Sequence, residues 1–187
     1  MQIRTVVELA ARWYVFFFLN VYGVGKIIGG QFYRPGRMPE DVAATTLAGA
    51  SNFDLAWAFM GRSFFYIVFI GVVEILGAWL LLWDRTKLIG VAILLPVMIN
   101  ILVFDVIFLD TYGALASATI YTLLLLLIAV CNREAVVRAL SALTQSEERE
   151  RLWTSEWWLT VGLALLAMGL LFGVDQLLVN LLGHGKG

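Results

Sequence analysis

Two long apolar segments, joined by a short charged turn, constrain the fold of this chain more than any other feature. They cover residues 62–83 and 87–109. About 20 apolar residues, at a rise of about 1.5 Å each, span a hydrocarbon core of about 30 Å, so each segment is long enough to cross a bilayer. Each also carries a polar residue near its middle, Glu74 in the first and Asn100 in the second. The segments therefore predict two antiparallel transmembrane helices with polar groups at membrane depth.

The composition favours lipid as the solvent for most of the surface. Hydrophobic residues make up 61% of the 187 residues. Charged residues make up 14%, against about 25% in an average soluble domain. The formal net charge of −1 leaves no concentrated basic face for phosphate binding, so nucleic acid is not expected as a partner. We expect an all-α transmembrane helical bundle.

Residues that bind metals are scarce in this sequence. The chain has one cysteine, Cys131, and one histidine, His184. A single cysteine forms no internal disulfide or CxxC pair, and a single histidine does not supply both axial ligands of a haem. No Cys/His cluster has the spacing of a zinc or iron–sulfur site. We expect no metal centre, and we identify no catalytic motif in this chain.

Three further segments have the length and composition of membrane-spanning helices. They cover residues 6–31, 112–131 and 155–187, the last with a short tail. The first is interpreted as a retained span rather than a signal peptide, because Glu8 and Arg12 interrupt its apolar run. Together with the two central segments, these give a core of four spans over residues 1–131 and a fifth, C-terminal span.

Two stretches are not expected to cross the bilayer. Within residues 32–61, Pro39 precedes two acidic residues and Ser51 precedes Asp54 by three positions, and both patterns are typical of helix starts. We predict an interfacial helix or lid over the outer mouth of the bundle, with a plain connecting loop as the alternative. Residues 132–154 combine helical apolar spacing with charge, which predicts an amphipathic cytoplasmic linker.

The distribution of Lys and Arg predicts the orientation. With five spans and the N-terminus inside, most basic residues fall on the inner side, as the positive-inside rule requires. These residues are Arg4, Arg12, Arg85, Lys87, Arg133, Arg138, Arg149 and Arg151. The C-terminus is then expected outside.

Polar residues inside the spans form the candidate site. A carboxylate at mid-membrane costs several kcal/mol unless it is neutralised or paired, so it is a functional candidate. Aligning the spans by their centres puts Asn20, Glu74 and Asn100 within a slab of about 8 Å. The predicted ligand-binding cluster is Asn20, Lys26, Tyr66, Glu74 and Asn100. An ion-paired outer rim is expected from Asp54, Arg62 and Asp105, with Lys26 at the same level.

The alternative for this cluster is purely structural. Glu74 would then be protonated or hydrogen-bonded to Asn20 and Asn100, and would hold helices together. Six glycines at spacings suited to close helix contact are predicted to pack against neighbouring helices. They are Gly25, Gly29, Gly71, Gly77, Gly169 and Gly173.

Several of these residues form a pattern that resembles the DoxX-like family of small membrane proteins. The family pattern is G-x-x-E-x-x-G-x-x-L-L-L, then an R-T turn, a Gly in the next helix and a polar residue deep within it. The residues that carry it are Gly71, Glu74, Gly77, Arg85, Thr86, Gly90 and Asn100, with Gly23 and Lys26 in the first span. The resemblance covers residues 12–131 and implies a four-helix bundle.

The resemblance also implies a function. Some DoxX-like proteins act in quinone-coupled sulfur oxidation, as the small subunit of a thiosulfate:quinone oxidoreductase. This implies a non-catalytic accessory or anchoring subunit in a bacterial cytoplasmic membrane, with a quinone near Glu74 and the aromatic residues Tyr22, Tyr66 and Trp79. One alternative is a small-molecule or proton-coupled carrier that uses Glu74. Another is an assembly subunit, without a ligand, that binds other membrane subunits or copies of itself.

Overall fold

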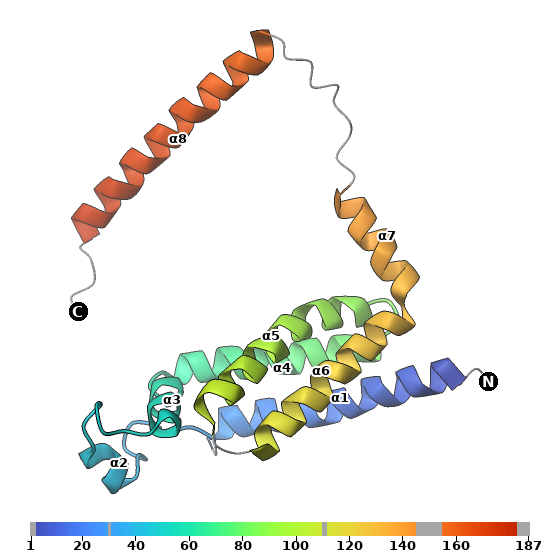
Figure 1. Ribbon diagram of the computed structural model, residues 1–187, viewed down its shortest axis with the longest axis vertical. Coiled ribbons are helices and arrows are strands. Elements are labelled where there is room, and N and C mark those ends of the chain that lie inside the picture. Colours follow the sequence, from blue (N-terminus) through green and yellow to red (C-terminus); the bar gives the residue numbers. More distant parts are fainter. Residues whose placement is uncertain (1–2, 30, 110–111, 145–154, 183–187) are drawn as a thin grey trace. The chain divides into compact units, whose positions relative to one another are not determined.

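A computed structural model describes residues 3–29, 31–109, 112–144 and 155–182 of the chain (Figure 1). These residues contain helices and no strand, so the predicted all-α class is confirmed for the described part of the chain. The chain divides into two compact units, Met1–Ala139 and Leu140–Gly187. The turn at residues 110–111, the charged run at 147–151, His184 and the C-terminal tail lie outside the described residues.

Four helices pack together in the first unit. They are α1 (Ile3–Ile28), α4 (Phe64–Leu82), α5 (Lys87–Phe108) and α6 (Tyr112–Cys131), and Figure 1 shows them side by side. The short helices α2 (Glu40–Ala44) and α3 (Asn52–Gly61) lie near one end of this bundle. The remaining helices are α7 (Arg133–Thr144) and α8 (Ser155–Leu182). The predicted boundaries agree closely for α4, α5 and α6, whereas α1 begins and ends earlier than the predicted 6–31.

Four of the described helices are long and apolar enough to cross a membrane: α4, α5, α6 and α8. The chain is therefore an integral membrane protein. Within the most apolar 18 residues of α4, α5 and α6, the buried shares are 33%, 22% and 33%, so most of their surface is left for lipid. Helix α1 is not among the four, and its crossing of the bilayer stays a prediction.

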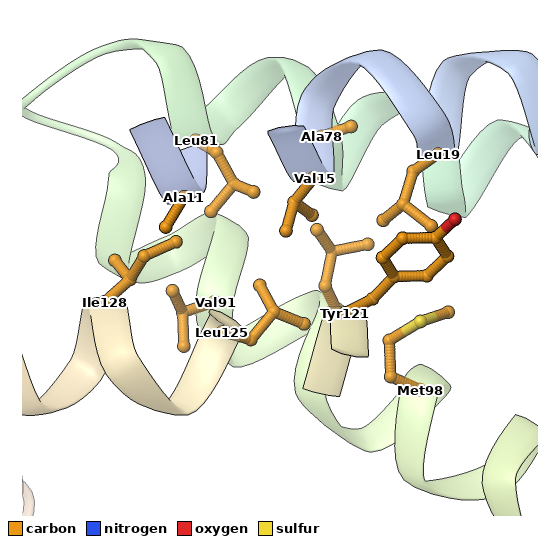
Figure 2. Close-up of a cluster of buried hydrophobic side chains, with 11 residues drawn as sticks. Ala11, Val15, Leu19, Ala78, Leu81, Val91, Met98, Tyr121, Leu125 and Ile128 are labelled. Carbon is orange, nitrogen blue, oxygen red and sulfur yellow. The ribbon is translucent and has the colours of Figure 1, made fainter. Parts of the chain in front are cut away.

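The core of the bundle is formed by one apolar stripe from each of its four helices. Figure 2 shows these side chains pointing toward one another between α1, α4, α5 and α6. The cluster consists of Ala11, Val15, Leu19, Ala78, Leu81, Val91, Leu94, Met98, Tyr121, Leu125 and Ile128. Because α1 supplies three of these residues, it belongs to the bundle core regardless of its own hydropathy.

Glycines set the distance between the central helices. A Cβ atom built on Gly23 would lie 2.8 Å from the carbonyl oxygen of Gly71, and one on Gly71 would lie 2.8 Å from that of Gly23. A Cβ atom on Gly77 would lie 2.6 Å from Leu94, and one on Gly90 would lie 2.8 Å from the Gly77 oxygen. The packing roles predicted for Gly71 and Gly77 are confirmed.

Gly25 and Gly29, predicted to pack α1 against a neighbouring helix, do not do so within the described part of the chain. A Cβ atom on Gly25 would meet no described atom within 4 Å. Gly29 has a φ of +109° and follows the last residue of α1, where a left-handed conformation ends the helix. The Arg34 guanidinium then donates to the carbonyls of Lys26 and Ile27, at 2.9 and 2.8 Å. Gly29 therefore terminates α1 and does not pack it.

The two glycines predicted to pack in α8 meet no neighbour within the described part of their own unit. A Cβ atom on Gly169 or Gly173 would meet no described atom within 4 Å. Their role in contacts with another subunit stays a prediction.

The segment between α1 and α4 follows its predicted helix starts. Helix α3 begins after Ser51, whose hydroxyl oxygen accepts from the Asp54 backbone N–H at 3.1 Å. Gly61 ends this helix where a Cβ atom would lie 1.9 Å from the Tyr33 carbonyl oxygen. That close approach holds α3 against the chain that leaves α1, so the plain connecting loop is excluded for residues 52–61.

A buried arginine fixes the opposite end of the bundle. The Arg12 side chain is 6% exposed and donates from Nε to the Leu81 carbonyl at 2.6 Å. Its Nη1 atom donates to Asp84 at 2.7 Å, and Lys87 binds Glu8 at 2.7 Å. Arg12 therefore satisfies a carbonyl in the last turn of α4 and ties α1 to the turn before α5. The sequence placed Arg12 at this end without indicating these contacts.

The glycine contact predicts a difference between two alanine variants. Gly71→Ala forces α1 and α4 apart, and overpacking of this kind costs about 1–3 kcal/mol of the free energy of unfolding. Gly25→Ala enters open space and is expected to cause no loss. Thermal unfolding of both variants in the same detergent measures the difference, and equal midpoints would contradict it.

The Arg12 contact predicts a pH dependence. A hydrogen bond from Arg12 lowers the pKa of the Asp84 carboxyl below its usual 3.8. This contribution to stability is present above the unfolded pKa and is lost as the pH falls through the lower folded pKa. Because the Asp84 side chain is 82% exposed, the contribution is expected to stay below about 1 kcal/mol. Asp84→Asn should lower stability at neutral pH and reduce the loss seen on acidification, measured by unfolding across pH.

Candidate functional site

A cavity of about 630 Å³ lies among the helices of the first unit. Residues of α1, α3, α4, α5 and α6 line it, together with Gln31 and Phe32 of the segment that follows α1. Most of its wall is apolar, and aromatic side chains reach it from several directions. Among them are Tyr22, Phe53, Trp57, Phe69, Phe104 and Tyr121. A cavity of this size and character is typical of sites for small molecules.

Three charged side chains line this cavity, and all three are buried. Lys26 of α1 is 7% exposed, Glu74 of α4 is 0% exposed, and Asp105 of α5 is 5% exposed. The Lys26 ammonium forms an ion pair with Oε1 of Glu74. These three residues form the charged cluster of the cavity. Burying such a cluster among apolar helices costs free energy of folding unless its positive and negative charges are balanced.

The backbone explains why Lys26 meets Glu74. Lys26 lies three residues after Gly23, and Glu74 lies three residues after Gly71, the two glycines at which α1 and α4 touch. Side chains in a helix lean toward its N-terminus. Since α1 and α4 run antiparallel, the two side chains lean toward each other from opposite sides of the glycine contact. The close approach of the backbones thus brings the ammonium to the carboxylate.

Two acidic groups of the charged cluster lack full compensation. The Oε2 atom of Glu74 is buried and has no hydrogen-bond partner among the described residues. No described residue forms a hydrogen bond or ion pair with the Asp105 carboxylate, although the positive charge of Lys26 acts on it. One ammonium therefore faces two carboxylates in one cavity.

The predicted cluster around Glu74 is partly wrong. Asn20 donates to the Phe16 carbonyl at 2.7 Å and accepts from the Trp79 indole at 3.1 Å, so it does not bind Glu74. Asn20 and Trp79 are both absent from the cavity wall. Alignment by span centres predicts the depth of Asn20 along α1. It does not predict which neighbouring helix the Asn20 side chain faces.

Other predicted site residues do line the cavity. Tyr66 and Asn100 are part of its wall, as is Tyr22, but neither Tyr66 nor Asn100 is hydrogen-bonded to Glu74. Glu74 as a link between Asn20 and Asn100 is therefore wrong. The partner of Glu74 is Lys26 instead.

The predicted ion-paired rim is also wrong for the described residues. Asp54 accepts from the Tyr33 hydroxyl at 3.2 Å and from Ser51, and Arg62 is exposed at the end of α3. Asp105 is buried in the cavity wall rather than at a rim. Lys26 belongs to the charged cluster and not to an outer layer, because its long side chain reaches back along α1 to Glu74. The repeated spacing of Gly23 to Lys26 and Gly71 to Glu74 was the sequence signal for this pair.

The described residues contain no group of three or more His, Cys, Asp or Glu side chains arranged to hold a metal ion. The lone Cys131 is half-buried and lines a smaller, polar pocket of about 180 Å³ with Arg4 and Arg138. That pocket lies apart from the charged cluster, with which it shares no residue.

Comparisons with known proteins add a relative without a stated role. The chain is 36% identical over 103 residues to a Bacillus subtilis (strain 168) protein described as the uncharacterized protein YwoB. The match covers 55% of this chain and 63% of that protein, so the chain spans less than two thirds of the relative's length. No family model and no solved structure matches. The DoxX-like resemblance thus stays a prediction.

The charged cluster predicts a non-additive response to mutation. Lys26→Met leaves Glu74 as an unpaired buried charge, which is expected to cost about 3–5 kcal/mol of the free energy of unfolding. The double variant Lys26→Met with Glu74→Leu removes both charges and should recover most of that loss. Denaturant unfolding in mixed detergent micelles measures the cycle, with Arg85→Met on the exposed turn as a control. Additive losses would show that the two side chains are independent.

Proposed function

We propose that this chain is a DoxX-like, non-catalytic accessory or anchoring subunit of a quinone-linked oxidoreductase in a bacterial cytoplasmic membrane. In this proposal the cavity holds the quinone head group. The observation that carries it is a cavity of about 630 Å³ with aromatic walls and a buried ammonium, Lys26, between membrane helices. A purely structural subunit has no need of such a cavity.

The wall chemistry suits a quinone head group. An ammonium has three donors, and Lys26 uses one of them on Glu74, so another is free to bind a quinone carbonyl. The hydroxyls of Tyr22 and Tyr66 are further donors on the wall, and aromatic faces from α3 and α5 stack well on a planar ring. Trp79 has no part in this proposal, because its indole binds Asn20 outside the cavity.

The proposal includes an orientation and a partner surface. We infer that α1 also crosses the bilayer and that the end of the bundle with Arg12 and Lys87 faces the cytoplasm, following the positive-inside rule. Helix α8 is apolar along most of its length and is long enough to cross a bilayer. In an accessory subunit this apolar helix, with Gly169 and Gly173, would contact other membrane subunits or a second copy.

Quinone retention tests this proposal. The wild-type protein purified in mild detergent should retain quinone, measured by mass spectrometry of the extracted lipid fraction. The Lys26→Met with Glu74→Leu variant should retain about tenfold less, because the donor to the carbonyl is lost. Asn20→Ala, which lies outside the cavity wall, should retain as much as the wild type. Wild-type protein without quinone in a quinone-containing membrane would contradict the proposal.

A second candidate, a small-molecule or proton-coupled carrier, is favoured by the incomplete compensation of the two carboxylates. A buried carboxylate whose charge is incompletely compensated is suited to gain and lose a proton as a substrate binds and leaves. In proteoliposomes, such a carrier would show uptake driven by a pH gradient, and Glu74→Gln would abolish it. Uptake that persists in Glu74→Gln would exclude Glu74 as the residue that changes protonation.

A further inference from the structure

The charge balance of the cavity points to the kind of ligand that completes it. The charged cluster contains one ammonium, Lys26, and two carboxylates, Glu74 and Asp105. The ammonium pairs with one oxygen of Glu74, and the other oxygen, Oε2, is buried without a partner. A buried ionised carboxylate without a counter-charge costs several kcal/mol. The cavity therefore requires one more positive charge, either a proton or a cation.

The walls of the cavity suit an organic cation better than a bare metal ion. A metal ion needs several oxygen ligands in a defined geometry, whereas most of this wall is aromatic or aliphatic. Phe53 and Trp57 of α3 stack with ring centroids 4.2 Å apart, and both line the cavity. Aromatic faces attract ammonium groups, most strongly where water is excluded. A cation with an apolar or aromatic body would be bound both by the carboxylates, through its charge, and by the aromatic wall, through its body.

We propose that this cavity binds a lipophilic organic cation, with its positive charge between Glu74 Oε2 and the Asp105 carboxylate and its apolar body against the aromatic side chains of α3, α4 and α5. This proposal rests on the cavity being a ligand site, the premise of the proposed function, and it names the substrate class of the carrier candidate. A neutral quinone leaves the proton that balances the second carboxylate in place, whereas a cation replaces that proton, and an organic anion adds to the repulsion.

The same geometry couples the cation to a proton. In the empty cavity a proton on Asp105 or Glu74 balances the charge, and the bound cation displaces it. The titratable or charged groups that share the cavity are Tyr22 and Lys26 of α1, Tyr66 and Glu74 of α4, and Tyr121 of α6. Helix α3 adds no charged or titratable group to the cavity wall. It contributes Phe53, Trp57, Phe59 and Met60. Binding of a permanent cation should thus strengthen as the pH rises and release a proton.

Two ions of similar size and opposite charge test the proposal. Tetraphenylphosphonium and tetraphenylborate are titrated into the full chain in lipid nanodiscs, at mildly acidic and mildly alkaline pH, with empty nanodiscs subtracted. The phosphonium ion should bind, more tightly at the higher pH, and the borate ion should not bind. Asp105→Asn should weaken phosphonium binding about tenfold and reduce its pH dependence.

The variants are chosen so that misfolding does not imitate a loss of binding. No described residue bonds to the Asp105 carboxylate, so Asp105→Asn is expected to unfold at the wild-type temperature. Asp54→Asn is the matched control, because Asp54 binds Tyr33 and Ser51 and does not line the cavity. It should bind the phosphonium ion as the wild type does.

Each other outcome has a defined meaning. Equal binding of both ions, or phosphonium binding unchanged in Asp105→Asn, would overturn the cation proposal. A decylquinone that binds in a titration where the phosphonium ion does not would also overturn it, and would leave the quinone function standing. If neither the quinone nor either ion binds, the cation proposal and the proposed function fail together.

Discussion

The close contact of α1 with α4 at Gly23 and Gly71 is the constraint on which the rest of the bundle depends. It brings the two backbones near enough that each glycine would clash with a side chain of any size on the other. One turn away on either side, Lys26 and Glu74 lean together and form a buried ion pair. A buried ion pair is stable only when its two charges lie close together. The glycine contact supplies this closeness, so the same contact both packs the two helices and neutralises Glu74.

The cavity follows from the same arrangement. Helices α1, α4, α5 and α6 are packed tightly around Leu81, Leu94 and Leu125, toward the end of the bundle that Arg12 ties together. Toward the other end, the chain between α1 and α4 turns back over the bundle, and α3 adds Phe53 and Trp57 to the cavity wall. The result is a well-packed half and a hollow half, with the charged cluster in the wall of the hollow half. This division explains how a small bundle combines stability with room for a ligand.

The sequence predicted the helices of the first unit more accurately than it predicted the partners of the polar side chains. The length of the apolar segments predicted the bounds of α4, α5 and α6 nearly to the residue. The pair Ser51 and Asp54 predicted the start of α3. Both signals are local in the sequence. The polar cluster was predicted less well. Depth along a span locates Glu74 and Asn20 at similar levels, yet the helix rotation that sends Asn20 to Trp79 depends on contacts between helices. The spacing of Gly25 and Gly29 likewise does not tell which face of α1 meets α4.

The sequence by itself determined that this is an all-helical membrane protein with an acidic residue, Glu74, buried at membrane depth. Those properties depend on apolar length and composition, which need no knowledge of the partner helix. Only the tertiary structure decided that Lys26 is the counter-charge of Glu74, that Asp105 shares their cavity, and that α3 contributes to its wall. The physical reason is that charge compensation in a membrane depends on distances of a few ångströms between residues far apart in the chain, and packing between helices sets those distances.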